Sequence, residues 1–254
     1  MMTLPVSEDF LPNGDGPRSQ TSMAYEVIRS DILNGRLVPE KKLKIQELAV
    51  QLDVSPGAVR EALSRLVPER LVVLRDQRGF VVAPLSLDDL NDLTNLRCEI
   101  EAIALRWSVE HGDVNWEANI LAAEHRLRSR STGSSEDDTR RIWTQNHAAF
   151  HTALISACGS RRLLALHAQL YEQSQRYRGL LTFHVEAGRD VDGEHHKIVE
   201  FALARNVKGL VDGMVNHLRL TTKLIVQSYG QPGASRARQR LRQSPPARAS
   251  RLTR

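Results

Sequence analysis

The sequence predicts a mainly α-helical protein that carries one short β-hairpin and divides into two domains. Apolar residues recur at helical spacing over most of the chain between residues 21 and 229. Two β-rich segments, at 71–74 and 80–83, interrupt this pattern and flank a charged tip that contains glycine. The composition, 41% hydrophobic and 26% charged residues, is that of a globular chain with a real core.

The two ends of the chain differ from this body. Residues 1–20 are predicted to be a disordered leader, and residues 230–254 a basic disordered tail with seven arginines and no acid. The net charge of the chain is +5, so subtracting the seven tail arginines leaves −2 for the rest. The overall charge is therefore a poor argument for binding nucleic acid.

The bulk features also exclude some classes. No apolar run approaches the roughly 18 residues of a membrane span, and the N-terminus lacks the pattern of a signal peptide. Cys98 and Cys158 lie in apolar helical patterns, which predicts buried free thiols rather than a disulfide framework or a zinc ribbon. We therefore expect a cytoplasmic protein without membrane contact.

The first domain, residues 21–84, reads as three helices followed by the hairpin. Thr21 or Ser22 is expected to cap the first helix. The second helix spans about 45–52. Ser55 caps a third helix with Pro56 at its first position, where a missing N–H costs nothing.

The second domain, residues 86–229, is expected to be an all-α antiparallel bundle. Gly, Asn and Ser residues break its pattern at intervals. Six helices are predicted, at 87–111, 115–130, 136–157, 160–186, 190–204 and 206–228.

Residues 45–66 have the spacing of a helix-turn-helix, in which the second helix enters the major groove of DNA. Ser55, Gly57 and Ala58 are small, which allows that helix to approach the bases closely. Its N-terminus offers free N–H groups to a phosphate. Arg60, on the outer face, is the first candidate for a base or phosphate contact, because arginine pairs bidentately with guanine.

Further basic residues surround this helix. Arg65 and Lys44 are expected to meet phosphates. Arg78 lies at the hairpin tip beside Gly79, whose missing side chain allows close approach to the minor groove. Taken singly, each could be a solvated charge on a plain three-helix unit. Their combination with the helix spacing favours a winged helix-turn-helix that binds DNA.

The sequence Val-Ser-Pro-Gly-Ala-Val-Arg-Glu-Ala-Leu at 54–63, followed by Arg-Gly-Phe-Val-Val at 78–82, resembles the GntR family of bacterial transcription regulators. The resemblance covers about residues 22–84. It implies a winged helix-turn-helix domain that binds double-stranded DNA.

Four positions depart from the family pattern. Glu40 and Arg70 stand where the family usually has glycine. Pro56 stands where many members carry an arginine that contacts DNA, and Gln46 where the fatty-acid regulator branch has another. The last two departures leave the operator sequence open.

Four histidines of the second domain could lie together. His147 and His151 are spaced i, i+4 and leave one helix face. His195 and His217 lie on two later helices that an antiparallel bundle can bring opposite. Spacing alone makes such a cluster a coincidence more often than a site. Of the other histidines, His196 should point away from the cluster, and three are read as ordinary: His125, His167 and His184.

Residues 87–228 resemble the FCD ligand-binding domain of the FadR branch. The motifs are Leu-Arg at 96–97 with a glutamate at 101, Phe-His at 150–151, Glu-His at 194–195 with an isoleucine at 198, and a late histidine at 217. The resemblance implies a cavity in which three histidines and an Asp or Asn often hold a divalent metal. His151, His195 and His217 match the histidines, and His147 occupies the Asp/Asn position.

The histidine at 147 changes the expected chemistry. Replacing a carboxylate by an imidazole removes a negative charge, which disfavours magnesium and manganese and favours zinc, nickel or copper. The same change strengthens attraction for an anionic effector, such as a small carboxylic acid. In the alternative interpretation the site binds no metal, and protonatable histidines bind the carboxylate directly. Arg97 either grips the acid or pairs with Glu101 at i+4.

The functional hypothesis is a homodimeric repressor that reads a palindromic operator and is released by a small organic acid. A metal-dependent enzyme using the four histidines is the main alternative. The sequence offers it no His-Glu-x-x-His pattern, and Glu194 is the only nearby candidate base. A third class is a nucleoid or RNA-binding protein using the tail, but that tail lacks aromatic residues for base stacking.

Overall fold

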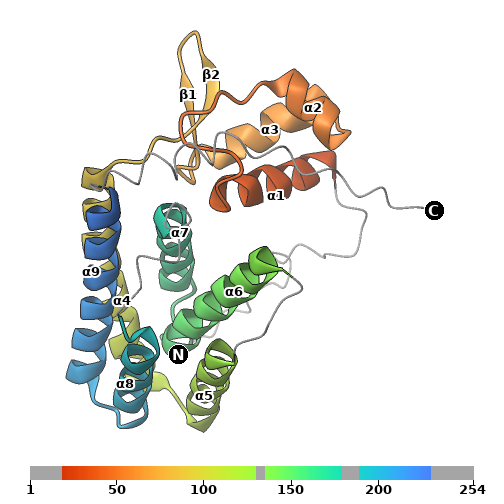
Figure 1. The fold of residues 1–254 in the computed structure, drawn as a ribbon. Coiled ribbons are helices and arrows are strands. Elements are labelled where there is room, and N and C mark those ends of the chain that lie inside the picture. The colour runs from red at the N-terminus through yellow and green to blue at the C-terminus, as the bar shows by residue number, and fades with distance from the viewer. Residues whose placement is uncertain (1–18, 130–134, 179–188, 230–254) are drawn as a thin grey trace, which may run out of the picture.

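The computed structural model describes residues 19–129, 135–178 and 189–229, and it forms two domains (Figure 1). The N-terminal domain contains three helices and a hairpin: α1 (Gln20–Leu33), α2 (Ile45–Leu52), α3 (Pro56–Leu66), β1 (Val72–Arg75) and β2 (Gly79–Val82). The helical domain contains α4 (Leu87–His111), α5 (Val114–Arg128), α6 (Glu136–Ile155), α7 (Arg161–Arg178), α8 (Val191–Leu203) and α9 (Val207–Tyr229). None of these described helices is long and apolar enough to cross a membrane.

The helix starts of the N-terminal domain follow from their caps. The Ser55 side chain accepts a hydrogen bond from the Ala58 N–H, and Pro56 opens α3, as predicted. The cap expected for α1 at Thr21 or Ser22 is wrong. Ser19 has the extended cap conformation and accepts from the Ser22 N–H, so the helix begins at Gln20. The last residue of the predicted leader is thus already helical.

Each strand of the hairpin lies one residue closer to the turn than predicted. Arg75 pairs with Gly79 and Val72 with Val82 in the antiparallel register. The turn between Arg75 and Gly79 uses left-handed residues, Gln77 (φ 60°) and Gly79 (φ 71°). The hairpin keeps the centre that the sequence predicted, and its paired residues extend one position further into the turn.

Two further left-handed residues stand where the GntR pattern usually has glycine. Glu40 has φ 65° and Arg70 has φ 59°. A Cβ is unfavourable in this conformation by roughly 1–2 kcal/mol. The structure thus explains both departures physically: the backbone keeps the shape that glycine favours, and the chain carries the strain.

Arg70→Gly is expected to raise the free energy of unfolding by about 1 kcal/mol, because glycine adopts this φ without strain. Urea denaturation of both proteins measures the gain. Arg70→Ala is the matched control, since it removes the arginine but keeps the Cβ. An equal gain in Arg70→Ala would show that the long side chain, and not the backbone conformation, is the cause.

The described residues of the helical domain form the six helices expected. Five have ends within two residues of the predicted ones. The fourth, α7, is described only to Arg178, and the rest of its predicted length lies outside the described residues. Cys98 and Cys158 are buried free thiols, as predicted. The main core joins α4, α5, α6, α8 and α9 through residues such as Leu105, Ile120 and Phe150.

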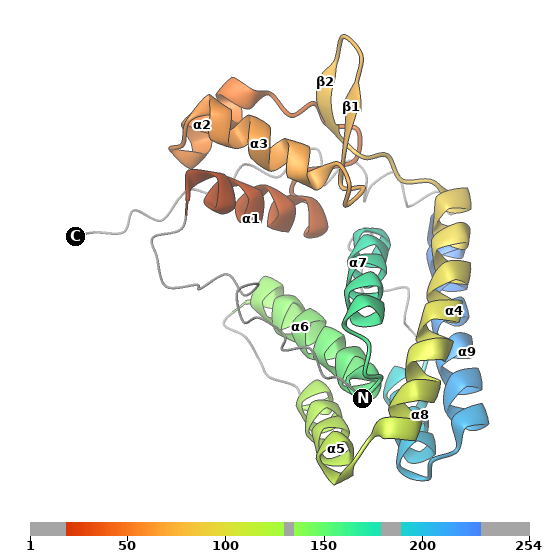
Figure 2. The same ribbon diagram turned by 180° about the vertical axis from the view of Figure 1, so that it is seen from behind.

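Helix α7 lies between the two domains. Figures 1 and 2 both show it beneath α1 and beside α4. A second apolar cluster holds it against α4 and α9 through Leu90, Leu170, Tyr177 and Ile225. The helix thus belongs to the helical domain but faces the N-terminal domain with one side.

Candidate functional site

The surface predicted to read DNA is open in this structure. Ser55, Gly57 and Arg60 are exposed at the start of α3, and Gln46 is exposed on α2. Helix α1 lies between α3 and α7 in both views (Figures 1 and 2), so the described helices of the helical domain do not cover these residues. A duplex can therefore approach the N-terminal end of α3.

Three of the residues proposed for this surface have other partners. Ala58 is only 7% exposed and belongs to the N-terminal core, so its assignment as a groove contact is corrected. It lies on the inner face of α3, with Val59 and Ala62. The Arg65 guanidinium stacks over the Tyr25 ring, 4.6 Å from its centroid. Lys44 pairs with Glu47 at 2.6 Å on the surface, a contact worth little in water.

The hairpin tip is as exposed as its predicted role needs. Arg78 and Gly79 are both exposed. No atom outside its immediate chain neighbours lies within 4 Å of the place where a Cβ on Gly79 would be. The backbone at the tip can therefore come close to a surface such as a groove edge.

The second candidate site is a cluster of four buried histidines in the helical domain, here called the histidine site. His147 and His151 come from α6, His195 from α8 and His217 from α9, and each is 1–2% exposed. One ring nitrogen from each lies within 4.8 Å of the others. The bundle thus brings together the four rings that the sequence singled out.

Two of the four rings in this site lack the hydrogen-bond partners that buried polar atoms normally have. Neither nitrogen of His151 nor of His195 has a hydrogen-bond partner among the described residues. Leaving such groups unpaired in a protein interior costs free energy. Two imidazoles with unpartnered nitrogens, converging with the rings of His147 and His217, fit a bound metal ion, which would use their lone pairs.

Burial also keeps these rings neutral. Desolvation lowers the pKa of His147, His151 and His217, and it lowers that of His195 to about 2. Nearby arginines and the other rings of the site lower these pKa values further. A neutral imidazole is the form that coordinates a metal, so the site needs no deprotonation near pH 7.

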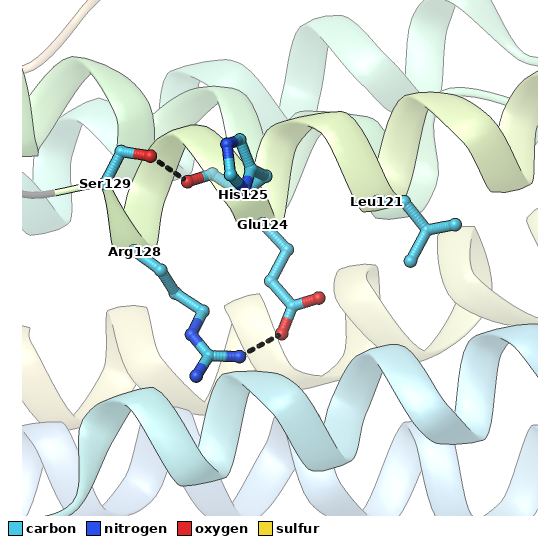
Figure 3. Close-up of a pocket in the computed structure, with 5 residues that line it drawn as sticks. All are labelled: Leu121, Glu124, His125, Arg128 and Ser129. Carbon is cyan, nitrogen blue, oxygen red and sulfur yellow. Dashed lines mark hydrogen bonds and ion pairs between the residues drawn. The ribbon is translucent and has the colours of Figure 1, made fainter.

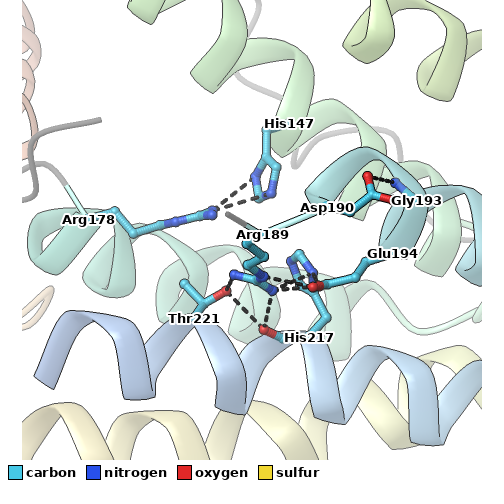
Figure 4. A network of polar contacts seen from close by, with 8 residues as sticks. All are labelled: His147, Arg178, Arg189, Asp190, Gly193, Glu194, His217 and Thr221. Atoms are coloured by element: carbon cyan, nitrogen blue, oxygen red, sulfur yellow. Dashed lines mark hydrogen bonds and ion pairs between the residues drawn. The ribbon is translucent and has the colours of Figure 1, made fainter. Parts of the chain in front are cut away.

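Outer groups hold two of the rings by hydrogen bonds, and a carboxylate lies near a third. His217 Nδ1 lies 2.9 Å from Glu194 Oε2 (Figure 4). His147 Nδ1 lies 2.8 Å from the Tyr171 hydroxyl. His151 Nδ1 lies 3.8 Å from Glu101, which is completely buried. A histidine that donates Nδ1–H to a carboxylate presents the Nε2 lone pair to the other side.

Two arginines approach the histidine site from different segments. In Figure 4, Arg178 points at His147, with Nη1 3.3 Å from both ring nitrogens. Arg189 donates to both oxygens of Glu194, at 2.8 and 2.6 Å, and to the His217 carbonyl at 3.1 Å. Sequence reasoning missed both arginines, because no spacing rule links the end of α7 or the start of α8 to the rings.

Arg97 forms an ion pair with Glu101, which is one of the two roles that the sequence left open for it. Its guanidinium donates to Ser174 at 2.9 Å and lies 3.4 Å from Glu101. His167 lies 2.9 Å from the same glutamate and is only 4% exposed, so reading it as an ordinary histidine was wrong. Its partner is 66 residues away in the chain, and no local pattern could reveal the pair.

The remaining histidines are peripheral, where the structure describes them. The His196 side chain is 52% exposed and contacts Glu124 at 2.9 Å, so it points away from the site, as expected. A shallow hollow on α5, lined by Leu121, Glu124, His125, Arg128 and Ser129, lies nearby (Figure 3). Glu124 is already engaged there by Arg128 and His196, which leaves this surface without an evident ligand group.

An exposed helix-turn-helix with a wing, joined to a helical bundle with a buried polar site, defines the class of two-domain regulators that bind DNA. Family models bear this out. Residues 20–82 match the gntR family of bacterial regulatory proteins, and residues 92–220 match the FCD domain. The chain belongs to the GntR family, in its FadR-type branch with an FCD domain.

Known relatives agree. The HTH-type transcriptional regulator BphR of Paraburkholderia xenovorans is 38% identical over 83% of this chain and 86% of its own length. The HTH-type transcriptional repressor GlaR of Escherichia coli is 32% identical over 80% and 94%. A GntR-type regulator structure from Rhodococcus has a TM-score of 0.68 at 22% identity, covering 84% and 100%. The family and its relatives are transcription regulators and not enzymes.

Proposed function

We propose that this DNA-binding regulator is a cytoplasmic homodimeric repressor whose histidine site holds a divalent metal, zinc or nickel, and a small carboxylate effector. The observation that carries this proposal is the histidine site itself. Four buried imidazoles converge, and two of them have no other partner among the described residues. A plain structural core would satisfy or exclude such polar groups.

The donor set supports zinc or nickel over magnesium. Four neutral nitrogen donors suit borderline metals, whereas magnesium and manganese prefer carboxylate oxygen. With His147 in place of a carboxylate, negative charge comes from the outer groups instead. Glu194 and Glu101 lie beside His217 and His151 and offset part of the charge of a bound ion.

The surroundings of the site also support an anionic effector. Arg178 lies against His147, and its guanidinium stacks 5.6 Å from the Trp143 ring centroid. A guanidinium can grip a carboxylate bidentately, with geometric specificity. Arg97, the sequence-based candidate for this role, is held by Glu101 and Ser174, so Arg178 is the better placed of the two.

The DNA-reading role needs two copies of the N-terminal domain. Two-fold protein symmetry matches a palindromic operator, as in helix-turn-helix dimers. One recognition helix α3 and one wing would meet each half-site. The relative named a repressor supports repression as the sign of control.

Arg60→Ala is expected to weaken operator binding by about 1–3 kcal/mol, which is roughly a 5- to 150-fold loss. Fluorescence anisotropy with the DNA upstream of the protein's own gene measures it, after footprinting has located a protected palindrome. Arg141→Ala is the matched control, an exposed arginine on α6 that pairs with Asp138 in the helical domain. Equal affinities of Arg60→Ala and wild type at every salt concentration would contradict the assigned reading surface.

A further inference from the structure

Helix α7 carries two polar faces that point to different domains. Residues on one face contact the surroundings of the histidine site, and residues on the other contact the N-terminal domain. The first set is His167, Tyr171, Ser174 and Arg178, and the second is Gln169, Glu172, Gln173 and Arg176. Both sets follow helical spacing, so each forms one stripe along the same helix.

The second stripe holds the loop between α3 and β1. The Gln169 side chain donates to the Pro68 carbonyl at 3.4 Å, and Gln173 donates to the Glu69 carbonyl at 3.2 Å. Arg176 donates to the Arg70 carbonyl at 3.1 Å. Three successive carbonyls that directly follow the recognition helix are thus bound by one helix of the other domain.

Arg176 also reaches the end of the hairpin. Its second amino group donates to the Ala83 carbonyl at 2.6 Å, just before the connection to α4. The residue is only 8% exposed, and burial lowers its pKa. Burying a guanidinium is costly unless its donors are satisfied, so this contact is a specific one.

A salt-bridge network reinforces the same junction. Arg29 of α1 lies 3.1 Å from Glu69 and also pairs with Glu172 of α7. The Tyr25 hydroxyl donates to Glu69 at 2.6 Å. The loop after α3 is therefore held from both α1 and α7.

The first stripe lies against the histidine site. The Tyr171 hydroxyl is 2.8 Å from His147 Nδ1, and Arg178 is 3.3 Å from the same ring. Ser174 accepts from Arg97, and His167 contacts Glu101 beside His151. A change in the position of these rings would act on α7 directly.

We infer that α7 couples the histidine site to the DNA-reading domain through the hydrogen bonds of Gln169, Gln173 and Arg176. An occupant that reorients His147 displaces Tyr171 and Arg178, and α7 carries the displacement to the loop that sets the position of α3. The inference rests on the proposed regulatory role of the site, and its direct test needs no metal.

The test is a double-mutant cycle on operator affinity in the metal-free protein. Tyr171→Phe cuts the link at the histidine end, and Arg176→Met cuts it at the other end at similar side-chain length. Contacts that act through one element are non-additive. We expect the double variant to differ from the product of the two single effects by at least about threefold. Additive effects overturn the coupling.

Zinc as the probe supplies the second measurement. The ratio of operator dissociation constants with and without zinc is expected to fall in the range of about 5- to 150-fold for the wild type. In Arg176→Met and in the double variant Gln169→Ala with Gln173→Ala, the ratio falls to about 1, while zinc affinity is unchanged. Arg162→Ala, exposed at the start of α7, keeps the wild-type ratio.

The outcomes separate the two proposals. A wild type that binds no zinc overturns zinc as the metal of the site, while the double-mutant cycle still decides the coupling. A wild type that binds zinc with no effect on operator affinity overturns the coupling by α7 but leaves the metal site intact. An Arg176→Met variant that keeps the wild-type ratio of operator dissociation constants also overturns the coupling by α7.

Discussion

His195→Ala is expected to lower zinc affinity by about a hundredfold to a thousandfold. Four-ligand zinc sites bind with about 10–16 kcal/mol at pH 7, so one ligand contributes roughly 2.5–4 kcal/mol. His195 is 1% exposed, and both its nitrogens lack a partner among the described residues, so it loses no other bond when replaced. Competition titration with a chromophoric chelator measures the affinity, and elemental analysis of the purified protein identifies the metal.

His196→Ala is the matched control, because it removes the neighbouring imidazole on the same helix, which points outward. Its zinc affinity should equal that of the wild type. Zinc at a thousand times its dissociation constant should also stabilise the wild type by about 4 kcal/mol, and His195→Ala by much less. Equal affinities of the two variants would show that zinc binds elsewhere.

The metal-free protein is expected to lose several kcal/mol of stability between pH 7 and pH 5. Burial holds the pKa of His195 at about 2 and those of His147 and His151 well below 6.5. Below pH 6.5 the unfolded chain takes up protons that the folded protein cannot, so stability falls as the pH falls. At pH 5 this amounts to about 2 kcal/mol for His195, and His147 and His151 add to the loss in the same direction.

Urea denaturation at the two pH values, in the presence of a chelator, measures this loss. The carboxylates do not contribute in this window, because Glu101 and Glu194 have lowered pKa values and their stabilising effect is lost only below about pH 4.5. His195→Gln should shrink the loss by about 2 kcal/mol. The same stability at pH 5 and pH 7 would show that these rings take up protons in the folded state.

Local chemistry made much of this molecule predictable. Caps and small residues place α3 at Pro56–Leu66, and the spacing of His147 and His151 puts both rings on one side of α6. The GntR pattern usually has glycine where this chain has Glu40 and Arg70, so the sequence alone singled out these two positions. In the structure both have a left-handed backbone. Each of these features depends on a few neighbouring residues, and that is why the sequence reveals it.

Other features depended on contacts between distant segments. Ala58 is small, like Gly57, but the packing of α3 on α1 and α2 turns it inward. His167 looks ordinary until α4 brings Glu101 to within 2.9 Å of it. Arg178 meets His147 only because α6 and α7 both border the same cluster. The packing of the helices brings such partners together, and no periodic pattern in the sequence predicts that packing.

The sequence by itself determined that this chain joins a DNA-reading unit to a helical bundle in which His147 and His151 share one helix face, because periodicity, caps and motif residues act over short spans. Only the tertiary structure decided what surrounds those histidines and how α7 joins them to the loop after α3. The reason is physical: burial and hydrogen bonding between segments far apart in the chain depend on how whole helices pack. The number of residues between two positions does not determine how close they lie in space.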